Sequence, residues 1–206
     1  MDGWEEMLQV NALSTILLGL LVLPLLLATA DGAGTKSSQP HLTFISSGNV
    51  WLLKPENLQD IINSEQSLQT LNEPAVFHSG GMPGQEQYSR SKMVLEYVVR
   101  HIAQLPSLVD PHGEPKVIID SACPGFCRSD LARRFKEASV TLRVLIWLVY
   151  TLFARTTEQG ANTYVSALTQ NARCHGEMWK DDQVYTPGPI VSTEAGKKFG
   201  DKIWTR

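Results

Sequence analysis

The sequence has few of the features that mark several common classes of protein. Its three cysteines, Cys123, Cys127 and Cys174, form no C-x-x-C pair and follow no regular spacing, which argues against a disulfide framework and a zinc site. The net charge is −3 and the basic residues are scattered, so the chain has no field that would attract nucleic acid. Internal repeats and low-complexity tracts are absent as well. We therefore expect reduced thiols, no metal site and no nucleic-acid partner.

Charge is also missing from the whole stretch Met7–Ala30, which contains the run ILLGLLVLPLLLATA. Three interpretations fit this stretch: a helix buried on a sheet, the apolar core of a secretory signal, or a membrane span. A secretory signal would begin with positive charge, but Asp2, Glu5 and Glu6 precede the run and the first cation is Lys36. A membrane span is weakened by the interrupting residues Gln9, Asn11, Ser14, Thr15 and Pro24. We favour the buried helix, and with it a cytoplasmic protein. The alternatives are a secreted protein or one associated with a membrane through residues 7–30.

What is present is the composition of a single globular domain, with 43% apolar and 19% charged residues. Two apolar runs predict strands. HLTFISS from His41 is a short run of strand length, and KVIIDSACPG from Lys116 is a β-branched run whose continuity predicts a buried strand. Between them, Glu86–Gln104 has apolar residues at three- and four-residue steps, which predicts an amphipathic helix. Alternation of helix and strand is typical of an α/β fold.

Other segments complete this pattern. Residues 48–84 are polar and rich in turns, so we expect an excursion from the sheet with a short helix near Pro55–Leu71. A helix is predicted over Val140–Phe153, and another opens at Thr156, which forms a capping box with Gln159. The run GEMWKDDQVYTPGP predicts a last strand or hairpin.

Tyr88 and Lys92 lie four residues apart at the start of the predicted helix over 86–104, so their side chains share one face. A nearby ammonium lowers the pKa of a tyrosine, which can then give and take a proton near neutral pH. Reduction of a carbonyl needs such a group. By itself the pair is weak evidence, because Tyr-x-x-x-Lys is frequent on solvated helix faces.

Four segments, in order, resemble the short-chain dehydrogenase/reductase family over almost the whole chain. DGWEEMLQVNALSTILLGLLVLPLL is similar to the family helix that carries an asparagine, here Asn11. HLTFISSG is similar to the strand that ends in the catalytic serine, here Ser47, and YSRSK matches the Tyr-x-x-x-Lys motif. CPGFCRS resembles the Pro-Gly segment, with the hydroxyl residue Ser129 four positions after the glycine. The sequence around these motifs is most similar to the retinol-dehydrogenase-like and fungal natural-product branches of the family.

The resemblance implies a role for each of these residues. Tyr88 would protonate the substrate oxygen as a nicotinamide hydride reaches the carbonyl carbon, while Lys92 would lower the pKa of Tyr88 and bind ribose hydroxyls. Ser47 would orient the carbonyl oxygen, and Asn11 would hold a water that relays protons to Lys92. The residues implied to bind the cofactor are Asn11, Tyr88, Lys92, Pro124, Gly125, Cys127 and Ser129.

The residues alone leave alternatives open at each of these positions. Ser46 could be the functional serine, with Ser47 a mere hydroxyl at the end of a strand. Asn11 could be an ordinary polar group of a helix, and Pro124 and Gly125 could only turn the chain.

The chain departs from the family pattern in its nucleotide-binding half. A complete member begins with a strand, a glycine-rich turn and a helix whose N-terminus receives the pyrophosphate. Here DGAG, SGGMPGQ and KKFGD neither follow a strand nor open a helix at the required spacing. We therefore expect one partial domain over residues 1–206. It would be the C-terminal part of a doubly wound Rossmann-like parallel sheet that lacks the glycine-rich half. The residue that would choose between NAD and NADP is missing too, and resemblance alone favours NADP slightly.

Two classes of function follow. The first is an NAD(P)H-dependent oxidoreductase that reduces a carbonyl or oxidises an alcohol on a small apolar substrate, such as a secondary metabolite. The second is a catalytically inactive, truncated remnant of such an enzyme, or a secreted protein with a signal peptide. Residues 128–154 would lie where the family places its substrate lid, although the apolar face of Val140–Phe153 fits a core helix equally. Without the glycine-rich turn, cofactor binding would be weak. An uncovered apolar sheet edge and one exposed face of the Asn11 helix would favour aggregation or a homo-oligomer.

Overall fold

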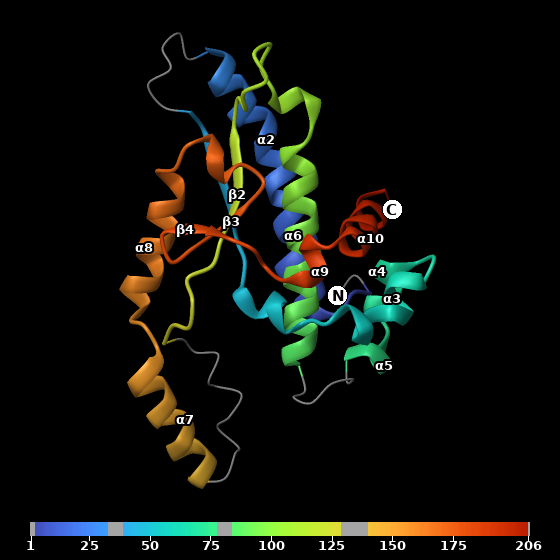
Figure 1. The fold of residues 1–206 in the computed structure, drawn as a ribbon, viewed down its shortest axis with the longest axis vertical. Coiled ribbons are helices and arrows are strands. Elements are labelled where there is room, and N and C mark those ends of the chain that lie inside the picture. Colours follow the sequence, from blue (N-terminus) through green and yellow to red (C-terminus); the bar gives the residue numbers. More distant parts are fainter. Residues whose placement is uncertain (1–2, 33–38, 78–83, 129–139, 206) are drawn as a thin grey trace.

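The structure, a computed structural model, describes residues 3–32, 39–77, 84–128 and 140–205. These residues form a four-stranded sheet in the order β1, β2, β3, β4 (Figure 1). β1 (His41–Ile45), β2 (Ile118–Ala122) and β3 (Met178–Lys180) are parallel, and β4 (Gln183–Tyr185) runs antiparallel to β3. The two predicted strands and the terminal hairpin are therefore confirmed in a mostly parallel α/β arrangement, and β2 is buried along its whole length as predicted.

Helices cover both faces of this sheet. α6 (Gln85–Ala103) and α2 (Thr15–Gly32) pack on one face, and α8 (Thr157–Leu168) packs on the other (Figure 1). The predicted capping box opens α8, with the Thr156 hydroxyl accepting from the Gln159 N–H at 3.1 Å. The further elements are α1 (Glu6–Leu8), the π-helical turn η1 (Gln9–Ser14), η2 (Gly48–Leu52), η3 (Pro55–Leu58), α3 (Gln59–Asn63), α4 (Ser67–Leu71), α5 (Pro74–Phe77), η4 (Pro106–Leu108), α7 (Val140–Phe153), η6 (Ala172–Cys174), α9 (Pro189–Ser192) and α10 (Glu194–Trp204).

The segment between η2 and α6 differs from its prediction. Instead of one short helix near Pro55–Leu71, it contains the separate pieces η3, α3 and α4, followed by α5. α3 ends because Ser64 adopts an extended backbone, and the Ser64 hydroxyl then bonds the Thr70 hydroxyl at 2.8 Å. These helices lie on the side of α6 away from β2, next to α10 (Figure 1).

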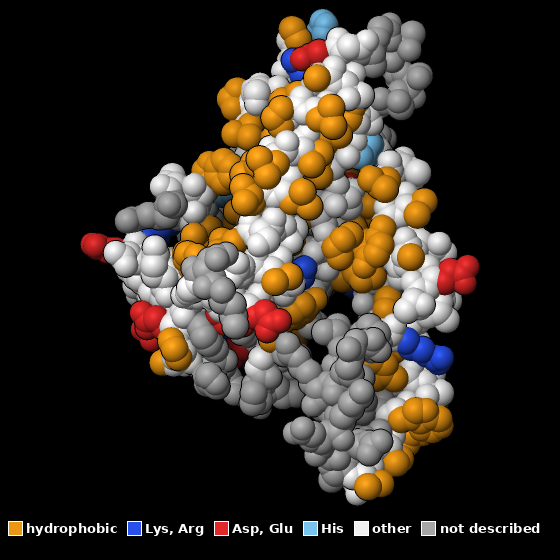
Figure 2. All heavy atoms as spheres, turned by 180° about the vertical axis from the view of Figure 1, so that it is seen from behind, with side chains coloured by type: hydrophobic (Ala, Val, Ile, Leu, Met, Phe, Trp, Pro, Cys, Tyr) orange, Lys and Arg blue, Asp and Glu red, His pale blue; other side chains and the backbone are white. Residues whose placement is uncertain are grey.

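The N-terminal apolar stretch forms the predicted helix, but the prediction that it is buried is wrong for its outer face. The continuous helix Glu6–Gly32 buries Gly19 and Leu23 against the sheet, where Gly19 approaches the Phe44 ring. Leu17 is 57% exposed and Leu21 is 69% exposed. Seen from behind, hydrophobic side chains gather along the upper half of the molecule, where this helix lies (Figure 2). By length and composition the helix would also suffice to cross a membrane.

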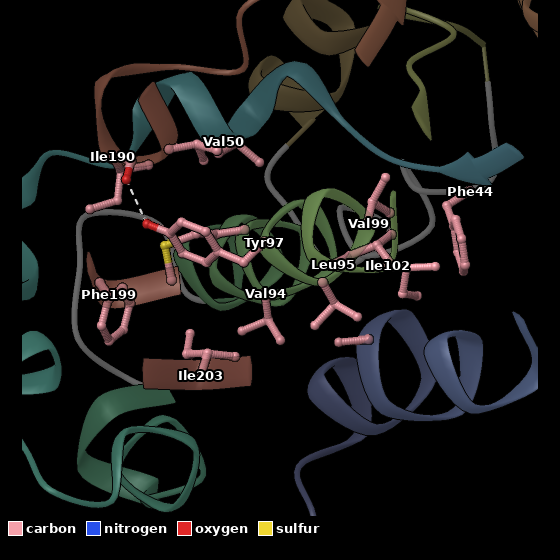
Figure 3. Close-up of a cluster of buried hydrophobic side chains, with 14 of the residues drawn as sticks. Phe44, Val50, Val94, Leu95, Tyr97, Val99, Ile102, Ile190, Phe199 and Ile203 are labelled. Atoms are coloured by element: carbon pink, nitrogen blue, oxygen red, sulfur yellow. Dashed lines mark hydrogen bonds between the residues drawn. The ribbon is translucent and has the colours of Figure 1, made fainter. Parts of the chain in front are cut away.

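α6 is the central element of the described fold. Its predicted apolar positions are buried, but so are Ser89, Ser91 and Glu96, so the helix is enclosed on nearly all sides rather than on one face. The helix is buried because other elements surround it. In Figure 3, side chains of α6 point in several directions, and Tyr97 is directed toward Ile190 and Phe199. The Tyr97 hydroxyl donates to the Ile190 carbonyl at 2.5 Å.

The last helix, α10, was not expected from the sequence. Thr193 caps it by accepting from the Gly196 N–H at 3.2 Å, and Phe199 and Ile203 are buried against α6. Gly200 allows the close approach, because a Cβ there would lie 2.5 Å from the Tyr97 ring. α10 therefore packs against the apolar side chains of α6, with Phe199 edge-on to the Tyr97 ring.

Candidate active site

The Ser47 side chain lies close enough to the Tyr88 phenol to influence its pKa. Tyr88 lies in the first turn of α6, which begins after Gly84, a residue with a φ of 80°. Ser47 follows β1 and caps η2, where its hydroxyl accepts from the Asn49 N–H at 3.2 Å. The fold therefore brings together two hydroxyls that the sequence separates by the whole excursion between η2 and α5.

Ser46 and Ser47 have different surroundings. Ser46 is 3% exposed, its N–H donates to the Ala122 carbonyl at 2.9 Å, and its hydroxyl has no partner among the described residues. Ser46 thus continues the pairing of the sheet, whereas Ser47 is the serine that reaches Tyr88.

Lys92 lies one turn after Tyr88 and is buried. Its ammonium donates to the Ile45 carbonyl, at the end of β1, at 2.7 Å. Burial lowers the pKa of Lys92, and the nearby Glu96 and Cys123 oppose that shift. One of the three N–H groups of the ammonium is used by Ile45, so further donors are available to hydroxyl groups of a ligand.

The pKa of Tyr88 is raised above its usual value of 10, chiefly because burial disfavours the phenolate. The nearby Ser47 side chain opposes the shift of the Tyr88 pKa, and Cys123 adds to it. This direction is opposite to the one that the resemblance implies for an activated tyrosine. The physical reason is that desolvation is the largest influence on the phenol, while the Lys92 ammonium is directed at the Ile45 carbonyl.

Asn11 lies in the π-helical turn Gln9–Ser14, a distortion that often marks functional sites. Its side-chain N–H donates to the Ser91 hydroxyl at 3.2 Å, and Ser91 in turn donates to the Tyr88 carbonyl at 2.7 Å. Asn11 is therefore joined to the turn of α6 between Tyr88 and Lys92.

The Pro-Gly segment leaves the end of β2 beside these residues. Gly125 has a φ of 78°, which only glycine adopts without strain, and Arg155 lies over it. Cys127 pairs with Arg155 in an isolated parallel bridge, and Arg155 forms an ion pair with Asp181 at 2.5 Å. Ser129 lies outside the described residues.

No family profile matches the chain. Curated relatives do: the chain is 35% identical over 203 residues to a short-chain dehydrogenase/reductase, ffsI, of Aspergillus flavipes, covering 98% of this chain and 54% of the relative. It is also 34% identical to the short-chain dehydrogenase/reductase phmF of Phaeosphaeria nodorum, again over 98% of this chain and 54% of the relative.

The chain belongs to the short-chain dehydrogenase/reductase family. It spans about half the length of the curated relatives it matches, with 54% of the first two covered. The observed α/β fold with a mostly parallel sheet fits the Rossmann-like architecture of this family. Short-chain dehydrogenase/reductases are oxidoreductases that use a nicotinamide cofactor.

The described residues fit one end of such a cofactor. Lys92 offers donors for ribose hydroxyls, and Gly125, with its positive φ, turns the chain just after β2. For the pyrophosphate, the described part of this short-chain dehydrogenase/reductase contains no glycine-rich turn that follows a strand and opens a helix. Nor do its described His, Cys, Asp and Glu residues form a cluster that could hold a metal ion.

Sequence reasoning missed two side chains at this site. Cys123 is buried beside Gly48 and has electrostatic contact with both Tyr88 and Lys92. Lys180, at the end of β3, would lie 3.7 Å from a Cβ at Gly48. In the sequence, Cys123 could be recognised only by its place directly before the Pro-Gly pair. Nothing in the sequence pointed to Lys180, because its approach to Gly48 depends on the order of the strands in the folded sheet.

A cavity of about 540 Å³ lies away from this short-chain dehydrogenase/reductase site, between α6, α9 and α10. Its charged residues are largely paired, with Arg100 bonded to Glu96 at 2.8 Å and His101 to Asp201 at 2.9 Å. This cavity is separate from the candidate active site at Tyr88.

Proposed function

We propose that the protein carrying this chain is an NAD(P)H-dependent oxidoreductase that reduces a carbonyl or oxidises an alcohol on a small apolar substrate. The observation that supports the proposal is the placement of the Ser47 hydroxyl close to the Tyr88 phenol, next to the buried ammonium of Lys92. Family membership and this arrangement support the same chemistry. We further propose a secondary metabolite of a fungus as the substrate, in keeping with the fungal relatives.

In the proposed mechanism, the Ser47 hydroxyl orients the carbonyl oxygen and the Tyr88 phenol donates a proton to that oxygen. Lys92 binds ribose hydroxyls and keeps a positive charge near the phenol as the proton leaves. Asn11 supports this turn of α6 through its bond to Ser91. A nicotinamide cofactor, with NADP slightly favoured over NAD by resemblance, supplies or accepts the hydride when bound.

The direction of the Tyr88 pKa favours reduction near neutral pH. A phenol whose pKa is raised keeps its proton, and a protonated Tyr88 can donate to a carbonyl at once. Oxidation of an alcohol requires Tyr88 to lose its proton first, so we expect oxidation to speed up only as the pH becomes alkaline.

The apolar helix α7 supports an apolar substrate. It lies next to the Pro-Gly segment, where Phe126 packs edge-on against Tyr150 with ring centroids 4.8 Å apart. Trp147 is 63% exposed and Phe153 is 72% exposed, so α7 presents aromatic surface near the site. We propose that α7 is part of the substrate lid.

The test is the variant Tyr88→Phe in the natural polypeptide that carries this sequence. With NADPH or NADH and a panel of apolar ketones, we expect Tyr88→Phe to lose about 10²–10⁴-fold in kcat, because the ring stays while the proton donor is removed. Tyr185→Phe is the matched control, since Lys180 packs on its ring at 4.5 Å and that contact needs no hydroxyl. The control should keep wild-type activity.

Turnover that survives in Tyr88→Phe would refute the proposed role of Tyr88. Absence of any turnover by the wild-type protein with all substrates and both nucleotides would favour the catalytically inactive alternative. Circular dichroism of each variant shows whether the fold is retained.

A further inference from the structure

Cys123 is the first residue after β2, and its sulfur is buried at the centre of the candidate active site. The side chain is 3% exposed, and the Cys123 N–H donates to the Trp179 carbonyl of β3 at 2.9 Å. Two backbone amides point at the sulfur: the Gly48 N–H at 3.1 Å and the Gly125 N–H at 3.4 Å. The thiol therefore acts as an acceptor for two separate loops.

These two loops carry the residues of the proposed reaction. Gly48 directly follows Ser47, and Gly125 directly follows Pro124. One loop leaves β1 and the other leaves β2, and the parallel pairing of these strands brings both to the same edge of the sheet. By accepting a hydrogen bond from the Gly48 N–H, the Cys123 sulfur restrains the backbone next to Ser47 and so the position of the Ser47 hydroxyl.

We propose that Cys123 is a positioning residue whose thiol ties the Ser47 loop to the Pro-Gly loop and so keeps the Ser47 hydroxyl opposite the Tyr88 phenol. This inference rests on the proposed function, since Ser47 and Tyr88 are placed in the reaction there. The thiol itself touches neither substrate nor reacting atoms in this role.

Cys174 provides a comparison within the same chain. It is 1% exposed and packs with Ala122, Ala167 and Trp179 in an apolar cluster on the α8 side of the sheet. Cys174 is therefore buried as deeply as Cys123 but is not bonded to either loop of the site. Substitution of Cys174 removes a buried sulfur only, whereas substitution of Cys123 also removes the hydrogen bonds from Gly48 and Gly125. Comparing the two substitutions separates these effects.

The test compares Cys123→Ala, Cys123→Ser and Cys174→Ala in the natural polypeptide. We expect Cys123→Ala to lower kcat about 10- to 100-fold with little change in KM, because misplacement of a reacting group affects the chemical step. Cys123→Ser should recover most of the loss, since a hydroxyl can accept from both amides. Cys174→Ala should lower the melting temperature and leave kcat unchanged.

A second measurement does not depend on turnover. Hydrogen exchange of the Gly48 and Gly125 amides, followed by NMR, should become faster in Cys123→Ala and stay slow in Cys174→Ala. Wild-type kcat in Cys123→Ala, or unchanged exchange at both glycines, would overturn the inference. A wild-type protein without Tyr88-dependent turnover would refute the proposed function instead, and the exchange data would still decide whether the thiol ties the loops.

Discussion

Ser46 and Ser47 carry the same side chain on adjacent residues, yet they differ in what they touch. The Ser47 hydroxyl lies near the Tyr88 phenol, while the Ser46 hydroxyl is enclosed without a partner among the described residues. In the proposed reaction the developing negative charge is on the oxygen that Ser47 faces, so only one of the two hydroxyls can stabilise it.

We expect Ser47→Ala to lower kcat about 10²-fold, by analogy with the loss of a single hydrogen-bond donor at a developing oxyanion. Ser46→Ala should keep wild-type kcat, because its hydroxyl is not directed at Tyr88. Ser47→Thr retains the hydroxyl and should keep part of the activity. Steady-state kinetics on the three variants measure this, and equal losses in Ser46→Ala and Ser47→Ala would show that the assignment is wrong.

At the scale of single residues, the sequence allowed part of the site to be predicted. Tyr88 and Lys92 share a helix, so their four-residue spacing alone places them on one face. The tie through Cys123 could not be predicted, because it depends on where the backbone amides of Gly48 and Gly125 point after folding. The raised pKa of Tyr88 likewise depends on burial by residues far away in the chain.

At the scale of elements, α2 shows how a uniformly apolar run can mislead. Its composition gives no polar face, which predicted a helix buried on a sheet, and the sheet covers only one side of it. Gly19 is the point of closest approach, and a Cβ at this position would overlap the Phe44 ring. Pro24 is accommodated inside the helix, although proline removes one hydrogen bond there.

We expect Gly19→Ala to destabilise the protein by about 1–3 kcal/mol, because overpacking against Phe44 outweighs the gain of about 1 kcal/mol that alanine brings to a helix interior. Gly32→Ala is the matched control in the same helix, since a Cβ there meets nothing within 4 Å, and it should be neutral or stabilising. Urea denaturation followed by circular dichroism gives both values.

A second substitution tests the cause of the Gly19 effect. Phe44→Leu alone should be destabilising because it leaves a cavity, but combined with Gly19→Ala it should restore part of the lost stability. Purely additive effects in this double-mutant cycle would contradict the proposed contact between α2 and β1.

Helices and strands could be predicted where the sequence pattern that defines them lies within their own residues. β1 and β2 are continuous apolar runs, α6 has a helical period and α8 has a capping box, so each could be found from its own residues. α9 and α10 could not, because their stability depends on distant partners. The Tyr97 hydroxyl bonds to Ile190, and Lys202 donates to the Ile62 carbonyl at 3.0 Å.

At the scale of the whole molecule, the sheet is asymmetric. Among the described residues β1 is bonded to β2 alone, and the outer face of α2 is apolar and exposed. In the proposed reaction the described residues provide the proton-transfer side chains and donors for a ribose, but among them no glycine-rich turn opens a helix to receive a pyrophosphate. Binding energy from the remote parts of a cofactor positions its reactive end. We therefore expect proton transfer to depend on pyrophosphate binding in the whole protein.

The sheet also contains a buried acid that couples the stability of the whole molecule to pH. Asp120 is fully buried on β2, opposite Thr43 of β1. Burial raises its pKa from 3.8 to about 7, the Thr43 hydroxyl opposes the shift, and the nearby Glu96 adds to it. Folded protein thus holds a proton on Asp120 that the unfolded chain releases near pH 4, so stability must fall as the pH rises from about 4 to about 7.

We expect Asp120→Asn to remove this dependence, because an amide resembles the protonated acid and cannot ionise. Near pH 4 the variant and the wild type should be equally stable, whereas at pH 7 the variant should be more stable by about 1–4 kcal/mol, the upper value being a shift of about three pKa units at about 1.4 kcal/mol each. Urea denaturation at half-unit steps between pH 4 and pH 8 measures the difference. Asp60→Asn, at an exposed position of α3, is the control and should follow the wild type at every pH. If Asp120→Asn and wild type gave parallel curves across this window, Asp120 would be ionised in the folded protein and the burial argument would be wrong.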